Sequence, residues 1–340
     1  MPAEPVPAQS IAVIGGGSWG TTLAWLLADN GHRVRLWLYE PELVDAIATT
    51  RENPRYLPGV PLPSSIEPTR SLKQAADGCR AVVFAVPSHA ARAVTKELHP
   101  HLAATTPVVI ATKGIEPESL MLMSELWLDV DRRRRPETLA ILSGPSFAKE
   151  VCRRLPTAVT LAAAPPLAAA LHPMLAAHYF RIYTSEDAIG AQIGGALKNV
   201  IALAAGVADG LGLGSNARAA LMTRGLAEIV RLGASMGARA ETFHGLSGLG
   251  DLILTCTGEL SRNRAVGLQL GQGKSLKSII SGMHMVAEGV STAKAAHALA
   301  KRQRVEMPIV HEIHAVLFNG KSPRNAVEDL LQRQTGVETL

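Results

Sequence analysis

The sequence predicts two domains, an α/β domain with a doubly wound, mostly parallel sheet at residues 10–188 and an all-helical domain at residues 189–335. Three observations predict this fold class. A glycine-rich turn near the start stands between an apolar run and a helical pattern, strand-length apolar runs then alternate with helical segments, and later only helical periodicity continues. The 340 residues are enough for two domains. Residues 1–9, which are rich in Pro and Ala, are expected to form a flexible N-terminus.

The first domain opens with a β-α-β unit. Residues 10–14 are an apolar run of strand length, residues 18–30 carry a helical pattern that ends at Gly31, and residues 33–38 predict a second strand. Further strands are expected at 80–86, followed by a helix from about residue 88, and at 107–112, 139–142, 158–162 and 180–183. This alternation predicts a parallel sheet with helices on both faces.

The second domain is predicted from helical periodicity with few β-branched runs. Its helices are expected near residues 189–209, 217–236, 262–272, 291–302, 307–318 and 322–333. Hydrophobic residues make up 47% of the chain and aromatic residues only 4%, so the core must be built mostly from Ala, Leu, Val and Ile. That composition favours α/β layers and close-packed helices over an all-β sandwich.

Composition also excludes several classes of function. Arg132–Arg135 form the one dense basic run, with no aromatic residues between them, so we expect a solvated loop and no nucleic-acid partner. The longest apolar stretch, around residues 158–171, is broken by Pro165 and Pro166, which argues against membrane insertion. The three cysteines lie far apart without metal-ligand spacing, so we expect no metal site, a reducing compartment and a cytoplasmic location. The N-terminus lacks the pattern of a signal peptide.

The turn after the first strand carries the strongest local motif. It reads Gly15-Gly16-Gly17-Ser18-Trp19-Gly20, a G-x-G-x-x-G between a strand and a helix. Gly15 would permit the tight turn, Gly17 would let a pyrophosphate approach the backbone, and Gly20 would let the helix pack on the strand. The N–H groups of the helix, including those of Ser18 and Trp19, would face the phosphates. The motif predicts a Rossmann domain that binds NAD or NADP.

Tyr39 and Glu40 end the second strand, where the adenosine ribose of such a cofactor would lie. Glu40 follows Gly20 by about the distance expected for the acid that binds the ribose. A carboxylate there favours the free 2′-hydroxyl of NAD, because it would repel a 2′-phosphate.

At this point the chain resembles the bacterial-type NAD(P)-dependent glycerol-3-phosphate dehydrogenases along nearly its whole length. The similar stretches are GGGSWGTTLA from Gly15, NPRYLPGV from Asn53, FAVPSHA from Phe84, ATKGIEP from Ala111, SGPSFAKEV from Ser143, LKNVIALAAGVADGLGLGSNARAALMTRGLAEI from Leu197, GLGDLILTC from Gly248, LSRNRAVG from Leu260 and VAEGVSTA from Val286. They occur in order and with compatible spacing.

The resemblance implies hydride transfer between a nicotinamide and C2 of glycerol phosphate, with Lys198 as the active-site lysine. It implies cofactor contacts at Lys113, Ala148, Arg262, Val286 and Glu288, and substrate contacts at Lys113, Gly144, Ser146, Lys198, Asp251, Ser261, Arg262 and Asn263. It also suggests a role in glycerophospholipid synthesis and a homodimer. One departure is Tyr39, where many members carry a basic residue, so we favour NAD or dual use of both cofactors.

The residues themselves suggest how the reaction would run. Lys198 stands in a stripe of small residues spaced by four, Gly190, Gly194, Ala202 and Gly206, which lets a substrate or another backbone approach that face of the helix. A protonated Lys198 would donate to the carbonyl oxygen, and the neutral amine would accept the proton in the reverse direction. Asp251, in a Gly-rich loop, could orient the amine, and Lys113 could lower its pKa.

Ser261, Arg262 and Asn263 form the candidate phosphate site. Ser261 is a good N-cap for the helix that follows, so its N–H groups would face the phosphate. Arg262 adds a bidentate donor and Asn263 an amide. His244 and His89 are weaker candidates, and Cys256 is expected to be a small buried residue.

Other interpretations stay open at this stage. The small-residue stripe also fits a helix–helix contact with Lys198 turned out to solvent. A second Rossmann-plus-helical dehydrogenase, acting on a hydroxy acid or a phosphogluconate-type substrate, shares the layout. A catalytically silent NAD-binding sensor would be favoured by loss of Lys198, Lys113 or Asp251, and all three are present.

Overall fold

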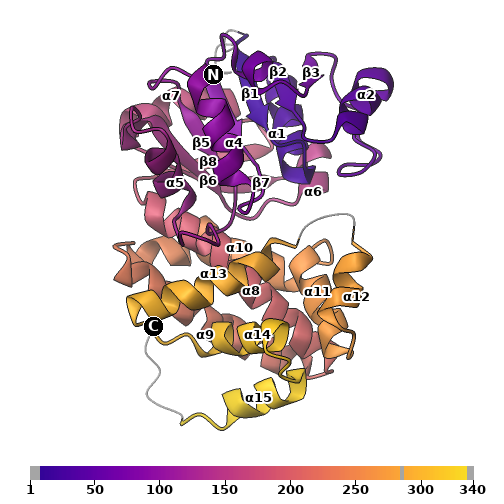
Figure 1. Ribbon diagram of the computed structural model, residues 1–340, viewed down its shortest axis with the longest axis vertical. Coiled ribbons are helices and arrows are strands. Elements are labelled where there is room, and N and C mark those ends of the chain that lie inside the picture. The colour runs from indigo at the N-terminus through magenta and orange to yellow at the C-terminus, as the bar shows by residue number, and fades with distance from the viewer. Residues whose placement is uncertain (1–7, 284–286, 335–340) are drawn as a thin grey trace. The chain divides into compact units, whose positions relative to one another are not determined.

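The computed structural model describes residues 8–283 and 287–334, and they form two compact units (Figure 1). Of these residues, the first unit contains those up to Thr112 together with Met123–Ala188, and the second contains Lys113–Leu122 and those from Ile189 onward. The segment Lys113–Leu122, which the sequence analysis places in the first domain, folds with the helical unit instead. Its residues Ile115 and Leu122 form an isolated antiparallel bridge and are buried in the helical core.

The first unit is built on one eight-stranded sheet with the order β3-β2-β1-β4-β5-β6-β7-β8. Every pair of neighbours is parallel except β6 and β7. The predicted doubly wound, mostly parallel sheet is therefore confirmed. The strands are β1 (Ser10–Ile14), β2 (Arg33–Trp37), β3 (Ile66–Thr69), β4 (Ala81–Phe84), β5 (Val108–Ile110), β6 (Leu139–Ser143), β7 (Thr157–Ala162) and β8 (Phe180–Ser185).

One strand, β3, is not predicted from the sequence. Its sequence, Ile66-Glu67-Pro68-Thr69, contains a proline and a charged residue, neither of which is typical of a buried strand. β3 lies at the edge of the sheet and pairs only with β2, so Pro68 interrupts no second ladder of hydrogen bonds.

Helices cover both faces of this sheet. Helices α1, α6 and α7 form one group, in which α1 packs against the other two. Helices α3, α4 and α5 form another, in which α4 packs against the other two. The strand order runs outward from β1 in two directions, and right-handed crossovers in opposite directions place their helices on opposite faces. The helices are α1 (Ser18–Asp29), α2 (Pro41–Thr50), α3 (Leu72–Ala76), α4 (Ala91–Leu98), α5 (Met123–Val130), α6 (Ala148–Cys152) and α7 (Pro165–Leu175).

The second unit is all-helical, as predicted, and is organised around α8. Residues 190–208 of this helix are all buried. The helices of this unit are α8 (Ala188–Gly210), α9 (Gly214–Ser235), α10 (Asp251–Thr257), α11 (Arg262–Gly271), α12 (Leu276–Ser281), α13 (Glu288–Gln303), α14 (Pro308–Phe318) and α15 (Pro323–Leu331). The short helices α10 and α12 are absent from the prediction, because six or seven residues carry little periodicity.

α8 is also long and apolar enough to cross a membrane, judged by length and hydropathy alone. However, 89% of its most apolar window is buried inside the protein, which is the environment of a core helix. The stretch at residues 158–171 that the sequence analysis treats as the longest apolar segment is divided between two elements, β7 and α7.

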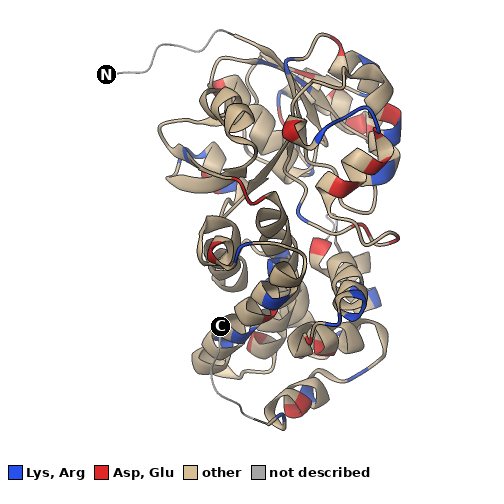
Figure 2. Cartoon of the chain, turned by 90° about the vertical axis from the view of Figure 1, so that its left-hand side faces the viewer, with Lys and Arg blue, Asp and Glu red and all other residues tan. Residues whose placement is uncertain are grey.

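Three arginines of the basic run, Arg132, Arg133 and Arg135, are exposed, as the sequence predicts, but the fourth, Arg134, is buried. The side chain of Arg134 is completely buried, and its guanidinium carbon lies 5.3 Å from the centre of the Trp127 ring. Arg134 Nε is 3.7 Å from Asp131 Oδ2, and its Nη1 donates to the carbonyl of Thr106 at 2.6 Å. Arg134 therefore contributes to the packing of the first unit, and Figure 2 shows basic and acidic residues mixed over each unit.

Candidate active site

The glycine-rich turn between β1 and α1 has the backbone geometry that its motif predicts. Gly15 has a φ of +113°, and a Cβ there would lie 2.7 Å from the carbonyl oxygen of Ala85. A Cβ on Gly20 would lie 1.8 Å from the carbonyl oxygen of Gly15, so the helix packs directly on the turn. A Cβ on Gly17 would meet nothing within 4 Å, which leaves that side of the turn open. Gly17 is thus the glycine at which a ligand can approach the backbone.

The N-terminus of α1 is suited to phosphate groups. Gly17 is its N-cap residue and provides no side-chain hydrogen bond. The first intrahelical bond runs from Thr21 N–H to the Gly17 carbonyl, so the N–H groups of Ser18 and Trp19 precede the ladder of the helix. These groups and the helix dipole favour an anion, and the pyrophosphate of a dinucleotide fits this turn.

Glu40 lies just beyond the end of β2 and is the N-cap residue of α2. Its Oε1 accepts a hydrogen bond of 2.6 Å from the hydroxyl of Tyr56, and Nη1 of Arg55 lies 3.9 Å from the same oxygen. Burial and the neighbouring Glu40 carboxylate raise the pKa of Tyr56, so this hydroxyl stays protonated and remains a donor. Tyr39 is 78% exposed. The carboxylate is therefore oriented by protein contacts at the carboxyl edge of the sheet.

Three further predicted contacts follow β6 at the same edge of the sheet. Gly144 has a φ of +141°, and a Cβ there would lie 2.9 Å from the Cα of Val159. Ser146 donates from its hydroxyl to the Gly144 carbonyl at 3.0 Å, and Ala148 is the first residue of α6. These residues form a tight turn after a buried strand, which is where doubly wound sheets bind ligands.

In the helical unit, Lys198, Lys113 and Asp251 meet in one buried cluster. Asp251 is 0% exposed; its Oδ2 accepts a hydrogen bond from Lys113 Nζ at 2.7 Å, and its Oδ1 accepts one from Lys198 Nζ. Lys198 also donates to the hydroxyl of Thr255 at 2.9 Å. The Lys198 side chain is only 9% exposed, so the alternative in which it is turned out to solvent is wrong.

The surroundings of Lys198 adjust its acidity. Burial lowers its pKa from 10.5 to about 8, the Asp251 carboxylate acts in the opposite direction, and the positive charge of Lys113 lowers it again. An amine with a pKa near 8 exchanges a proton readily close to neutral pH.

The small-residue stripe of α8 serves backbone contacts. A Cβ on Gly194 would lie 2.4 Å from the carbonyl oxygen of Ser247, and a Cβ on Gly206 would lie 2.1 Å from that of Arg264. The first contact seats the turn Leu246–Gly250 against α8, one helical turn before Lys198. The sequence leaves open whether a substrate or another backbone segment approaches this stripe. At Gly194 and Gly206 it is another backbone segment.

The sequence predicts that Asp251 lies in a Gly-rich loop, and this prediction is wrong. Asp251 is the first residue of helix α10. The residues before it, Leu246–Gly250, form a π-helical turn. Thr255 follows Asp251 by four residues, so both side chains lie on one face of α10 and reach Lys198. Thr255 is not predicted from the sequence as a site residue, because its spacing from Asp251 is informative only in a helix, and residues 251–257 are not predicted to be helical.

Ser261 is the N-cap of α11, which confirms that prediction. Ser261 is buried, and its side chain accepts a hydrogen bond from the backbone N–H of Arg264 at 3.3 Å. Arg262 is the first residue of the helix and is exposed. An exposed guanidinium at a helix N-terminus is a suitable group for binding a phosphate.

Asn263 has its side chain directed into the helical unit. Its Nδ2 donates to the side-chain oxygen of Asn199 at 2.9 Å, and its Oδ1 accepts from the backbone N–H of Gly289 at 2.9 Å. Asn199 directly follows Lys198, and Gly289 directly follows Glu288, the first residue of α13. One buried amide therefore joins the helix of the lysine to the N-terminus of α13. Val286 lies outside the described residues.

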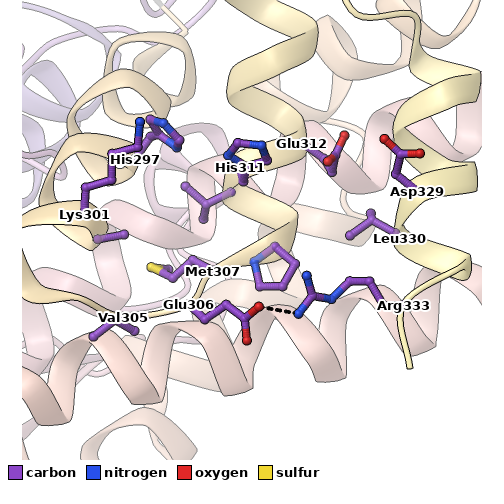
Figure 3. A pocket seen from close by; sticks show the side chains of 13 residues that line it. His297, Lys301, Val305, Glu306, Met307, His311, Glu312, Asp329, Leu330 and Arg333 are labelled. Atoms are coloured by element: carbon purple, nitrogen blue, oxygen red, sulfur yellow. Dashed lines mark hydrogen bonds and ion pairs between the residues drawn. The ribbon is translucent and has the colours of Figure 1, made fainter. Parts of the chain in front are cut away.

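Two pockets in the helical unit lie apart from this cluster. One of about 410 Å³ is lined by residues of α13, α14 and α15, and Figure 3 shows the ion pair of Arg333 and Glu306 there. A second, of about 600 Å³, includes His244, and neither pocket is lined by Lys198 or Asp251. Cys256 is buried in the helical core, as expected. Among the described residues, no group of three or more His, Cys, Asp and Glu side chains could hold a metal ion.

A parallel sheet with a dinucleotide-binding turn, together with a helical unit that contains a buried lysine of lowered pKa, defines a nicotinamide-dependent dehydrogenase. The chain matches the model of the NAD-dependent glycerol-3-phosphate dehydrogenase N-terminus over residues 10–169 and that of the C-terminus over residues 187–328. It therefore belongs to the NAD-dependent glycerol-3-phosphate dehydrogenase family, and the predicted resemblance is confirmed.

Relatives and solved structures agree with this assignment. A Syntrophotalea carbinolica protein named glycerol-3-phosphate dehydrogenase (NAD(P)+) is 52% identical over 331 residues, which cover 97% of this chain and 99% of that protein. The crystal structure of glycerol-3-phosphate dehydrogenase from Coxiella burnetii matches with a TM-score of 0.92 and 41% identity, covering 96% of this chain and 99% of that one. The yeast enzyme matches with a TM-score of 0.81 and 28% identity, covering 96% and 100%.

Proposed function

We propose that the protein catalyses reversible hydride transfer between NADH or NADPH and dihydroxyacetone phosphate, giving sn-glycerol 3-phosphate. The observation that carries this proposal is the buried cluster of Lys198, Asp251 and Lys113 in a chain of this family. The first unit would hold the cofactor, and the second would supply the acid–base group. The relatives named above are glycerol-3-phosphate dehydrogenases, which supports the choice of substrate.

Lys198 is the proposed general acid and base. The nicotinamide, when bound, would supply the hydride for C2 of the ketone. As that bond forms, the Lys198 ammonium donates a proton to the carbonyl oxygen, and its charge stabilises the negative charge that develops there. Its bonds to Asp251 and Thr255 use two of the three ammonium protons, and we assign the third to the substrate oxygen. In the reverse direction the neutral amine accepts the hydroxyl proton.

Asp251 and Lys113 would set the state of that amine. The carboxylate orients Lys198 and favours its charged form, whereas Lys113 opposes that charge. Lys113 also carries a second positive charge close to the reacting oxygen. The two residues thus shift the pKa of Lys198 in opposite directions.

The cofactor would be held mainly by the first unit. The open side of Gly17 and the N–H groups of Ser18 and Trp19 would bind the pyrophosphate, and Glu40 would accept a hydrogen bond from the ribose 2′-hydroxyl. A carboxylate at this point disfavours a 2′-phosphate, so we propose NAD as the preferred cofactor, with NADP as an alternative. Family resemblance adds Lys113, Ala148, Arg262, Val286 and Glu288 as cofactor contacts.

The phosphate of the substrate would be bound at the N-terminus of α11. Arg262 is exposed there, and Ser261 caps the helix. Family resemblance adds Gly144, Ser146 and Asn263 to the substrate contacts. Asn263 would act through its buried amide, which already fixes Asn199 beside Lys198.

The test is a spectrophotometric assay at 340 nm with dihydroxyacetone phosphate, run separately with NADH and NADPH. Oxidation of either cofactor supports the reaction, and the ratio of the two kcat/KM values tests the proposed preference for NAD. If protein that binds the cofactor oxidises neither, a panel of hydroxy acids and phosphogluconate-type substrates identifies the rival dehydrogenase. Inactivity on that whole panel would favour a silent NAD-binding sensor.

We also propose a cytoplasmic homodimer that supplies glycerophospholipid synthesis. The free cysteines Cys79, Cys152 and Cys256 suit a reducing compartment. Leu213, Ile253 and Leu260 are each at least 41% exposed, and a second copy could cover apolar surface of this kind. Sedimentation equilibrium tests the dimer, and cell fractionation tests the compartment.

A further inference from the structure

A short segment between α2 and β3 reaches into the glycine-rich turn. Asn53 is 0% exposed, and its Nδ2 donates to the carbonyl of Gly16 and to the hydroxyl of Thr21, both at 2.9 Å. The Thr21 hydroxyl in turn donates to the same Gly16 carbonyl at 3.0 Å. Two side chains from different parts of the first unit therefore hold one carbonyl group of the turn.

The same segment reaches the ribose acid three residues later. The backbone N–H of Tyr56 donates to Asn53 Oδ1 at 3.1 Å, and the Tyr56 hydroxyl donates to Glu40 Oε1 at 2.6 Å. The backbone N–H of Leu57 donates to the Asn53 carbonyl at 3.0 Å and closes the turn. We call residues Asn53–Leu57 the brace, because they connect the glycine-rich turn to Glu40.

The carbonyl that the brace holds determines the direction of an N–H group in the turn. The Gly16 carbonyl and the Gly17 N–H belong to one planar peptide, so fixing the first fixes the second on the opposite side. Gly15, Gly16 and Gly17 have unusual backbone freedom, and without a restraint this peptide could rotate. Because Asn53 is buried, rotation would deprive its amide of one of its two acceptors, the Gly16 carbonyl, which is unfavourable.

We propose that Asn53 and Tyr56 are positioning residues for the dinucleotide. Asn53 holds the Gly16–Gly17 peptide in the orientation that presents its N–H to the pyrophosphate. Tyr56 holds the Glu40 carboxylate in the orientation that accepts the ribose 2′-hydroxyl. The proposal rests on the proposed function, because it concerns the cofactor of that reaction, and neither side chain touches the reacting atoms.

Asn30 offers a matched control for a purely structural role. It stands at the other end of α1 as its C-cap residue, and its Nδ2 also donates to two backbone carbonyls, those of Met174 and Ala176, each at 3.1 Å. Replacing Asn30 by alanine removes two side-chain hydrogen bonds from the first unit, and replacing Asn53 removes three, the third being the one that its Oδ1 accepts from the Tyr56 N–H. Only the Asn53 bonds involve the glycine-rich turn.

The experiment compares Asn53→Ala and Asn30→Ala in the full-length protein. NADH binding is measured by nucleotide fluorescence, thermal unfolding by calorimetry, and KM for NADH and kcat by the 340 nm assay. We expect both variants to unfold at lower temperature, but only Asn53→Ala to raise Kd and KM for NADH, by about tenfold, with kcat at saturating NADH little changed. A Kd equal to that of Asn30→Ala would overturn the role of Asn53. Failure of the wild type itself to bind NADH would instead refute the proposed function.

A second variant covers the case in which Asn53→Ala does not fold. Thr21→Val removes the hydroxyl that joins Asn53 to the Gly16 carbonyl and keeps the size of the side chain. We expect a rise of roughly threefold in the Kd for NADH, the effect of one hydrogen bond. A folded Thr21→Val protein that binds NADH as tightly as the wild type would overturn the proposal.

Tyr56→Phe isolates the second half of the brace, since it removes only the hydroxyl. Without that donor the Glu40 carboxylate is free to turn towards Arg55, and the discrimination against a 2′-phosphate should weaken. We expect the ratio of Kd for NADPH to Kd for NADH to fall by about fivefold. An unchanged ratio would show that Tyr56 does not position Glu40 for the cofactor.

Discussion

Asp251 holds Lys198 by a hydrogen bond from the lysine Nζ to the carboxylate Oδ1, inside a helical core where the aspartate is 0% exposed. The other carboxylate oxygen lies 2.7 Å from Nζ of Lys113. The buried Asp251 carboxylate is thus paired with two lysines. It stabilises the positive charge of each, whereas the two lysine charges repel each other. The pKa of Lys198, about 8, results from burial and from these opposed influences.

Lys198→Ala should lower kcat by roughly 10²- to 10⁴-fold, because it removes the acid–base group. The ion pair of Lys113 and Asp251 would remain, so the buried carboxylate would keep a partner and the fold should persist. Rates at 340 nm measure the loss, and NADH fluorescence shows whether the cofactor is still bound. A folded variant with the kcat of the wild type would rule out the assignment.

The two directions of the reaction should depend on pH with opposite signs. Reduction needs the protonated amine, so its kcat/KM should be level below a pH of about 8 and fall about tenfold per pH unit above it. Oxidation needs the neutral amine and should rise with pH up to about 8 before it levels off. Initial rates in both directions between about pH 6 and pH 10 test this. Profiles that fall together on the alkaline side would contradict it.

Asp251→Asn and Lys113→Met should move the pKa of Lys198 in opposite directions. The aspartate raises this pKa, so its loss should shift the alkaline fall of the reduction rate to lower pH. Lys113 lowers the pKa, so its loss should shift the fall to higher pH. Both variants should also be slower than the wild type. Shifts in the same direction would mean that the cluster does not control the lysine.

Arg262→Ala should raise KM for glycerol 3-phosphate by about 10- to 100-fold, as expected for lost charge-assisted hydrogen bonds to a phosphate. Its effect on plain glycerol, a very poor substrate, should be small. Arg264→Ala is the matched control on the same helix, because Arg264 is paired with Asp209 at 2.7 Å. Equal losses on glycerol and glycerol 3-phosphate would refute a phosphate role for Arg262.

Glu228 should make the stability of the protein depend on pH. Its buried carboxyl accepts the backbone N–H groups of Ile309 and Val310, and burial raises its pKa from 4.5 to about 7. A raised folded-state pKa means that stability is greatest below pH 4.5 and is lost as the pH rises to about 7. The difference corresponds to about 3 kcal/mol.

Glu228→Gln removes this titration, so the variant serves as the reference for the wild type. Relative to it, the wild type should lose about 3 kcal/mol of unfolding free energy between about pH 4.5 and pH 7.5. Urea unfolding of both proteins at the two pH values provides the measurement. A constant difference between them would show that Glu228 does not titrate in this range.

Much of the first unit could be predicted from local sequence. The expected strands at 10–14, 33–38 and 139–142 correspond to β1, β2 and β6, because short apolar runs between turns are diagnostic of a buried parallel sheet. The edge strand β3 and the short helix α10 could not be predicted, because their sequences carry no clear strand or helix pattern. Their conformations depend on the elements that pack beside them. Arg134 was assigned to solvent because nothing in the sequence placed Trp127 and Asp131 around it.

The sequence by itself determined the features that depend on adjacent residues. The positive φ of Gly15, the close packing of Gly20 on the Gly15 carbonyl and the capping of α11 by Ser261 are local features of this kind. Only the tertiary structure decided which polar groups share a buried environment. Asp251 lies 53 residues from Lys198 and 138 from Lys113 along the chain, so their contact requires α8, α10 and the segment Lys113–Leu122 to pack in one core. The acidity of Lys198 is a property of that packing, because burial and neighbouring charge are established only when distant segments meet.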